Sequence, residues 1–187
     1  FNNLVFENAL NTQLWVVPES LGCGSVRQKN GELVIDYKCP GSKFDIQARR
    51  GNRTLENMRS FEARVKIGSN GQDTSGRFWM EIAGNRGGDN WAIQCFIELG
   101  GGSGVAELAC PGAPATRLRR DQYYKIRLDL DPDSGVASFY LDGELRGKYT
   151  DPMARYANKL TPGFGALNAG PAALSTIYVD DVWVSPP

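Results

Sequence analysis

The sequence contains no histidine. Histidine is the side chain that most often exchanges protons near neutral pH, and it is the commonest protein ligand of metals. Catalytic sites of the Ser-His-Asp and Cys-His types, and zinc sites built on histidine, are therefore excluded. Any enzymatic chemistry in this chain would have to use carboxylates, tyrosine, lysine or arginine.

The sequence also lacks an excess of charge and a long apolar run. Its 21 basic and 21 acidic residues cancel, so there is no general attraction to nucleic acid or to an anionic membrane. No stretch approaches the roughly 20 apolar residues that span a bilayer. We therefore expect neither a nucleic-acid partner nor insertion into a membrane.

The length of 187 residues and the ordinary apolar content of 41% suit one globular domain with a single core. No internal repeat, low-complexity tract or linker divides residues 1–187. The start at Phe1 shows neither a charged leader nor an apolar signal core. We expect a single domain that is mature or excised from a larger extracellular protein, whose other domains would then be partners.

The four cysteines form two local pairs, Cys23 with Cys39 and Cys95 with Cys110. Each pair brackets a predicted connection between two strands, where the Cα separation that a disulfide needs can be met. Three connectivities are open, and four reduced thiols in a cytosolic protein are the alternative. A zinc site lacks both CxxC spacing and histidine. The local disulfides predict an oxidising compartment, extracellular or at the cell surface.

Apolar and polar residues alternate with a period of two along most of the chain, which is typical of strands buried on one face. Clear examples are 60–67, 76–82 and 123–130. Further strands are predicted at 25–28, 32–37, 44–49, 91–98, 105–110, 136–141, 145–149 and 176–184. Asn30-Gly31, Asn70-Gly71 and Asp142-Gly143 predict tight hairpin turns, and Asp133-Ser134-Gly135 is a further turn signal. Many short strands with frequent turns indicate an all-β sandwich or barrel.

One segment, 151–160, has a helical pattern. Asp151 is a suitable N-terminal cap, and Pro152 suits the first helical position. We expect a short helical turn there.

Several motifs follow one another in an order that is informative as a set. They are Phe6-Glu7-Asn8, Leu14-Trp15-Val16-Val17, Asn30 to Ile35, Ser60 to Ile67, Tyr123 to Leu130, Val136 to Leu145, and Tyr178 to Val184. This order resembles the concanavalin A-like lectin/glucanase superfamily, particularly its laminin-G-like modules. The resemblance covers nearly the whole chain and implies an antiparallel two-sheet jelly-roll sandwich, with the first and last strands side by side. Lectins, glycosidases, lyases and adhesion modules share that fold.

Retaining glycosidases of this superfamily resemble one another in a Glu-x-Asp-x-Glu run along one strand, which brings nucleophile and acid onto one face. The sequence has no such run. Glu81 and Glu98 each stand alone on a strand. They are either a cross-strand pair in a glycan-active hydrolase or solvated charges, so we assign no catalytic residue.

A ligand-binding face is predicted on the two strands that carry these glutamates. If the apolar residues of both strands face the core, alternation places the intervening residues together on the opposite face. These are Arg77, Trp79, Glu81, Gln94, Phe96 and Glu98. An aromatic ring among such groups suits a sugar, because the ring stacks on C–H groups and the polar groups bind hydroxyls. Glycine-rich segments at 84–88 and 99–104 would form its rims. Alternatively, a loop covers Trp79 and the charges only pair across the strands.

Calcium is the one cofactor that the sequence suggests. Jelly-roll binding modules often resemble one another in an early Glu and a late Asp that share a structural ion. Glu7 and Asp181, with Asp180 beside it, match that pattern in type and place. Ca²⁺ prefers such oxygen ligands. The alternative is an edge position that faces water.

These observations predict a non-catalytic, extracellular, lectin-like module that binds an oligo- or polysaccharide. Two alternatives stay open: a hydrolase that uses Glu81 and Glu98, and an adhesion or sensor ectodomain that binds a protein or small ligand.

Overall fold

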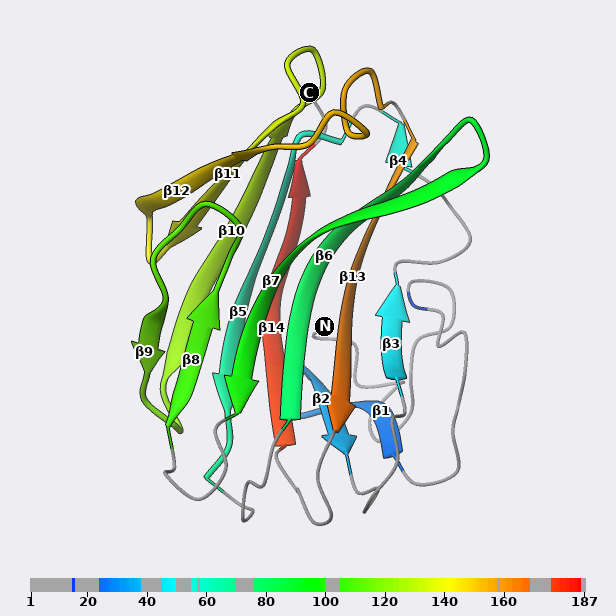
Figure 1. The fold of residues 1–187 in the computed structure, drawn as a ribbon. Helices are drawn as coiled ribbons and strands as arrows, with labels where there is room; N and C mark the ends of the chain where they lie inside the picture. Colours follow the sequence, from blue (N-terminus) through cyan, green and yellow to red (C-terminus); the bar gives the residue numbers. More distant parts are fainter. Residues whose placement is uncertain are drawn as a thin grey trace.

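The computed structural model describes residue 15 and residues 24–37, 45–49, 55–56, 58–69, 76–99, 105–157, 159–168 and 176–185. Within these residues the chain forms two antiparallel sheets that stack face to face, with β6, β7 and β13 in front of β5 and β14 in Figure 1. The jelly-roll sandwich predicted from the sequence is confirmed. The described residues contain no helix that is long and apolar enough to cross a membrane.

The first sheet, sheet A, has the strand order β1-β2-β14-β5-β10-β11-β12. Its strands are β1 (Gly24–Lys29), β2 (Glu32–Tyr37), β14 (Thr176–Ser185), β5 (Ser60–Ile67), β10 (Tyr123–Asp131), β11 (Val136–Leu141) and β12 (Glu144–Thr150). The last strand, β14, thus lies in the same sheet as the first two and pairs directly with β2.

The second sheet, sheet B, has the order β3-β13-β6-β7-β8-β9, and β4 also pairs with β13. Its strands are β3 (Asp45–Arg49), β4 (Leu55–Glu56), β13 (Lys159–Asn168), β6 (Gly76–Arg86), β7 (Asp89–Leu99), β8 (Ala106–Ala109) and β9 (Thr116–Leu118). The long hairpin of β6 and β7 occupies the middle of this sheet.

The core lies between the two sheets and is built by strand alternation, since every second residue of a strand faces inward. Phe164 of β13 is at its centre. The Phe164 ring centroid lies 5.7 Å from that of Trp15, 5.1 Å from that of Phe61 in sheet A and 6.0 Å from that of Phe78 in sheet B. Such aromatic contacts stabilise the sandwich beyond the area they bury.

Every strand predicted from alternation overlaps a strand of the structure. Two of the three predicted hairpin turns are confirmed, because Asn30, Gly31, Asp142 and Gly143 all have positive φ. Asn70-Gly71 lies outside the described residues. The short β4 and β9 and the longer β13 were not predicted. Pro162 and two glycines in β13 are residues that disfavour strands, and they concealed its pattern.

The short turn that Asp151 was predicted to cap is present, but the helical pattern predicted over 151–160 is wrong. Asp151 does cap the local chain, because its Oδ1 accepts a hydrogen bond from the Met153 amide at 2.8 Å. Only a turn at 152–156 follows, however, and β13 begins at Lys159. Tyr156 has a φ of 62°, which a right-handed helix does not allow.

A β-bulge in β14 changes which side chains face outward. Asp180 pairs with Arg64, but the next pair joins Trp183 to Glu62, so β14 carries one extra residue at this point. Asp181 has a φ of 47°, as the first residue of a bulge can. Beyond the bulge Val182 packs against the core, and Trp183 faces solvent with 52% of its surface exposed.

Candidate functional site

The six residues predicted to bind a ligand lie on the outer face of sheet B. The register of β6 and β7 joins Arg77 to Glu98, Trp79 to Phe96 and Glu81 to Gln94, in three directly opposed pairs. The expected juxtaposition of the six residues is therefore present. Their role in binding stays a prediction, and the three pairs differ greatly in how open they are.

Trp79 does not present an open ring. Only 5% of its surface is exposed, and its ring covers Gly165 on the neighbouring strand β13. A Cβ atom at Gly165 would lie 2.2 Å from Cζ2 of Trp79, so the ring occupies the space that a side chain would need. Trp79 is therefore buried, although the contact that the structure shows is with strand β13 and not with the loop of the alternative. Replacing Trp79 would therefore change packing as well as any contact with a ligand.

Glu81 is buried beside Trp79, with 2% of its surface exposed. Its Oε2 atom accepts a hydrogen bond from Nε2 of Gln94 at 2.7 Å and another from Nε1 of Trp79 at 3.2 Å. A buried carboxylate is tolerated when hydrogen bonds compensate for the water that it loses. Gln94 and Trp79 thus fix Glu81 in one position.

Arg77, Phe96 and Glu98 form the open part of this face, which we call the Arg77 cluster. An Arg77 Nη2 atom lies 2.6 Å from Glu98 Oε1, and the two side chains are 43% and 42% exposed. The Arg77 guanidinium carbon lies 4.6 Å from the centroid of the half-buried Phe96 ring. The cluster offers a flat cation, an aromatic ring and a carboxylate within one patch.

Glu81 and Glu98 are not directly opposed in the register. Glu98 is opposite Arg77, which is four residues from Glu81 along β6. The two carboxylates of a glycosidase share an accessible groove. Glu81 is buried, and Glu98 is paired with Arg77.

The glycine-rich segments predicted as rims have different positions. Gly84 belongs to β6, where Trp91 covers it: a Cβ atom there would lie 2.6 Å from Cζ2 of Trp91. Gly87 and Gly88 make the turn between β6 and β7, both with positive φ. In the second segment Leu99 ends β7, and 100–104 lie outside the described residues.

The predicted calcium ligands are only partly described. Glu7 lies outside the described residues. Asp181 Oδ2 lies 3.1 Å and Asp180 Oδ2 3.9 Å from Nη1 of Arg64, so the two adjacent carboxylates share one arginine, whose charge offsets that of one of them. Among the described residues no group of three or more cysteine or acidic side chains is placed to hold a metal. Calcium stays a prediction.

The disulfide between Cys95 and Cys110 is confirmed, with a Cα–Cα distance of 4.3 Å. It links β7 to the end of β8 from within sheet B. Cys23 and Cys39 lie outside the described residues.

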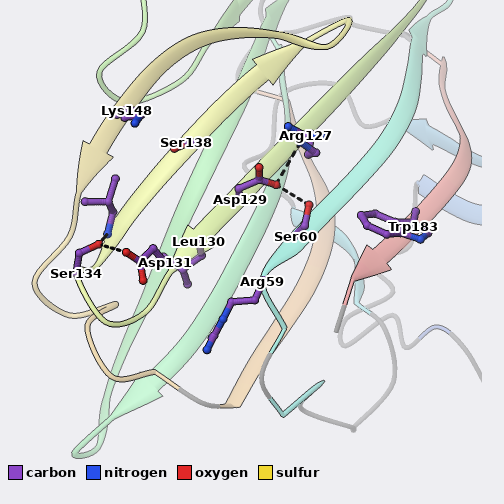
Figure 2. Close-up of a pocket in the computed structure, with 11 residues that line it drawn as sticks. Arg59, Ser60, Arg127, Asp129, Leu130, Asp131, Ser134, Ser138, Lys148 and Trp183 are labelled. Atoms are coloured by element: carbon purple, nitrogen blue, oxygen red, sulfur yellow. Dashed lines mark hydrogen bonds and ion pairs between the residues drawn. The ribbon is translucent and has the colours of Figure 1, made fainter. Parts of the chain in front are cut away.

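A second candidate region, not predicted from the sequence, lies on the outer face of sheet A. An open groove of about 630 Å³ crosses β14, β5, β10, β11 and β12, with Trp183 at one end and Lys148 at the other (Figure 2). It is lined by Arg59, Ser60, Arg127, Asp129, Leu130, Asp131, Ser134, Val136, Ser138, Lys148 and Trp183. The apolar residues of β14 alternate in one phase before Asp181 and in the opposite phase after it. This change of phase was the signal in the sequence that could have revealed that Trp183 faces outward.

In this groove, which we call the sheet A groove, both acidic side chains have partners close by. Asp129 Oδ1 accepts a hydrogen bond from Ser60 Oγ at 2.6 Å and lies 3.2 Å from Nε of Arg127. Asp131 accepts hydrogen bonds from Ser134 Oγ at 2.6 Å and from the Asp133 amide at 3.0 Å. The Ser134 hydrogen bond, above all, lowers the pKa of Asp131.

No protein-family model and no curated protein matches this chain. Solved structures do match it. An alginate lyase from Pseudomonas aeruginosa is 13% identical with a TM-score of 0.68, over 95% of this chain and 100% of that one. A laminarinase from Flavobacterium sp. UMI-01 is 15% identical with a TM-score of 0.66, over 95% of each chain. The carbohydrate binding module CBM66 from Bacillus subtilis is 11% identical with a TM-score of 0.59, over 94% and 97%. The chain has the concanavalin A-like jelly-roll fold that these proteins share.

Proposed function

We propose that this chain is an extracellular carbohydrate-binding domain that holds its ligand at the Arg77 cluster, without catalysis. The observation that carries the proposal is the Arg77 cluster itself. A guanidinium held between the Phe96 ring at 4.6 Å and the Glu98 carboxylate at 2.6 Å cannot rotate freely. Such a fixed group loses little conformational entropy when a ligand binds.

The chemistry of the cluster suits a sugar. The planar guanidinium has several N–H donors in a fixed geometry, which fits neighbouring hydroxyl groups. The Glu98 carboxylate accepts hydrogen bonds, and Phe96 offers an apolar surface to C–H groups. The structural similarity to glycan-active and glycan-binding proteins supports the same ligand class.

We infer the absence of catalysis from the carboxylates of β7 and of the neighbouring strand β6. Gln94, Phe96 and Glu98 alternate on one face with the spacing of a Glu-x-Asp-x-Glu run, but only the last is acidic. The neighbouring carboxylate, Glu81, is buried and fixed by Gln94 and Trp79. One accessible carboxylate lacks the partner that glycoside hydrolysis requires.

An extracellular location agrees with the Cys95–Cys110 disulfide, since disulfides persist in oxidising compartments. The similar structures include an alginate lyase and a carbohydrate binding module.

Binding to a panel of neutral and acidic polysaccharides, measured by calorimetry, tests the proposal. We expect Phe96→Ala and Arg77→Ala to weaken binding by roughly tenfold or more, the effect of about 1.4 kcal/mol. Tyr178→Ala is the matched control, because Lys66 lies over the Tyr178 ring at 4.2 Å on the opposite sheet in a similar pair outside any proposed site. Binding by no polysaccharide, or equal losses in all three variants, would remove the Arg77 cluster as the site.

The second part of the test is a search for products. Incubation with bound polysaccharides should release neither new reducing ends nor unsaturated uronates. If wild-type protein does release products and Glu98→Gln does not, the domain is an enzyme.

A further inference from the structure

We propose that the sheet A groove is a second glycan-binding site, specific for acidic oligosaccharides. It lies on the face of the sandwich opposite the Arg77 cluster and does not depend on that cluster. Its ligand would stack a sugar ring on Trp183 and pair sugar carboxylates or sulfates with Arg59 and Lys148.

Trp183 is the first feature that points to a ligand. Of the four tryptophans in the chain, Trp15, Trp79 and Trp91 are at most 8% exposed, whereas Trp183 is 52% exposed. The bulge at Asp181 places it outward, at the end of the sheet A groove (Figure 2). An indole at the end of a polar groove is a stacking surface for the C–H face of a sugar.

The cations are the second feature. The sheet A groove has three cationic and two acidic side chains in its lining. Both carboxylates already accept hydrogen bonds from serine hydroxyls, and Arg127 pairs with Asp129. Among the described residues, Arg59 and Lys148 make neither an ion pair nor a side-chain hydrogen bond, and the charge of Arg59 acts on Asp131 only as a minor contribution beside the hydrogen bonds of that carboxylate. Two cations therefore remain for an anionic ligand.

The shape is the third feature. The sheet A groove crosses five strands from β14 to β12, which is roughly 19 Å at the usual spacing between strands. Three serines, Ser60, Ser134 and Ser138, line it and offer hydroxyl donors and acceptors. A chain of several sugars fits such a length. An extended peptide that binds by strand addition would need free backbone groups at a sheet edge, whereas this groove runs over the face of paired strands.

Tryptophan fluorescence gives a readout confined to this site, because acrylamide reaches an exposed indole far more readily than buried ones. The probes are hexamers of alginate, polygalacturonate and heparin, each compared with its uncharged counterpart, in which carboxyls are reduced and sulfates removed. We expect at least one acidic hexamer to protect Trp183 from acrylamide. Its uncharged counterpart should bind roughly tenfold or more weakly, and added salt should weaken binding of the acidic form.

Variants separate the sheet A groove from the Arg77 cluster. Trp183→Ala should abolish the protected signal, and the double variant R59Q/K148Q should bind the acidic hexamer roughly tenfold more weakly. Lys125→Gln is the control cation: it lies on the same outer face but already pairs with Glu62 at 3.1 Å. Phe96→Ala should leave protection of Trp183 unchanged, whatever happens at the Arg77 cluster. Melting temperatures confirm that each variant is folded.

Three results would overturn the proposal. They are no protection by any acidic hexamer at millimolar concentration, equal affinity for an acidic hexamer and its uncharged counterpart, and unchanged affinity in R59Q/K148Q.

Discussion

On both sheets alternate residues of a strand point outward, but the two outer faces differ in how far these outward side chains are buried. On sheet B, Trp79 and Glu81 point away from the core and are nevertheless buried, because the Trp79 ring rests on Gly165 of the adjacent strand. On sheet A, aromatic and charged residues remain partly exposed. Lys66, for example, lies 4.6 Å from the Tyr123 ring centroid and 4.2 Å from that of Tyr178.

The difference shows that an outward side chain becomes part of the packed interior when a neighbouring strand supplies glycine. Sheet B therefore depends on close packing on both faces, whereas the outer face of sheet A depends on exposed polar pairs of small individual value. Substitutions on the two outer faces should accordingly lower the free energy of unfolding by different amounts.

The largest effect is expected from opening the disulfide of sheet B. Cys95 and Cys110 close a loop with a sequence separation of 15, for which the entropy model gives about 3 kcal/mol. The double variant C95A/C110A should therefore unfold at a clearly lower denaturant concentration. Chemical denaturation with and without reductant measures this change. A loss below about 1 kcal/mol would mean that packing alone holds β7 against β8.

A smaller loss is expected where Trp79 covers β13. Gly165→Ala places a Cβ atom 2.2 Å from Cζ2 of Trp79, and overpacking of this kind costs about 1–3 kcal/mol. The same substitution in a Trp79→Leu background should cost much less, because the smaller side chain leaves room. Equal losses in both backgrounds would show that the ring does not lie on Gly165 in solution.

On sheet A, removing one exposed pair should cost still less. Tyr140→Leu loses the contact with Arg127, whose guanidinium carbon is 3.9 Å from the ring centroid. We expect a loss of about 0.5–1 kcal/mol in urea denaturation. Tyr149→Leu is the control, since Tyr149 is 41% exposed and no cation covers it among the described residues. A cost as high as that of Gly165→Ala would remove the contrast between the faces.

The smallest effect concerns Glu32 of β2. Burial raises its pKa above the ordinary value of 4.5, while Lys66 opposes that rise. The folded state therefore binds this proton more readily than the unfolded state, so the group's contribution to stability is full below pH 4.5 and is lost as the pH rises through the raised pKa. Glu32→Gln should raise the free energy of unfolding at pH 7 by on the order of 0.5 kcal/mol.

Thermal unfolding of Glu32→Gln and wild type between pH 3.5 and pH 7 measures this difference, which should shrink toward the acid end. A variant less stable than wild type at pH 7 would show that the ion pair with Lys66 outweighs burial. Since the chain has no histidine, we expect little change between about pH 6 and pH 8.

Much of the fold was predictable because strand alternation and hairpin turns are local. The pattern in 60–67 predicted β5 with its observed bounds, and Asn30-Gly31 predicted a real turn. By contrast, β13 was missed because Pro162 disfavours a strand locally, yet pairing with β3 and β6 on both sides holds this segment extended.

The candidate sites were predictable only in part. Alternation placed Trp79 and Phe96 on one face, but burial of Trp79 depends on Gly165, which is distant in the sequence. The sheet A groove depends on side chains from five strands and on one backbone irregularity, none of which a single segment reveals. The residues that share one face of a strand can be identified from one segment of the sequence, whereas the residues that line a groove come from several strands.

The bulge at Asp181 also makes the middle of β14 unusually tolerant of a change in chain length. Deleting one residue from an internal strand normally turns every later side chain to the wrong face. Here the removed residue would be the extra one. Without Asp181, regular alternation from Asp180 would still direct Val182 inward and Trp183 outward. β14, which lies between β2 and β5, could thus lose Asp181 without a change in which of its side chains face the core and which face solvent.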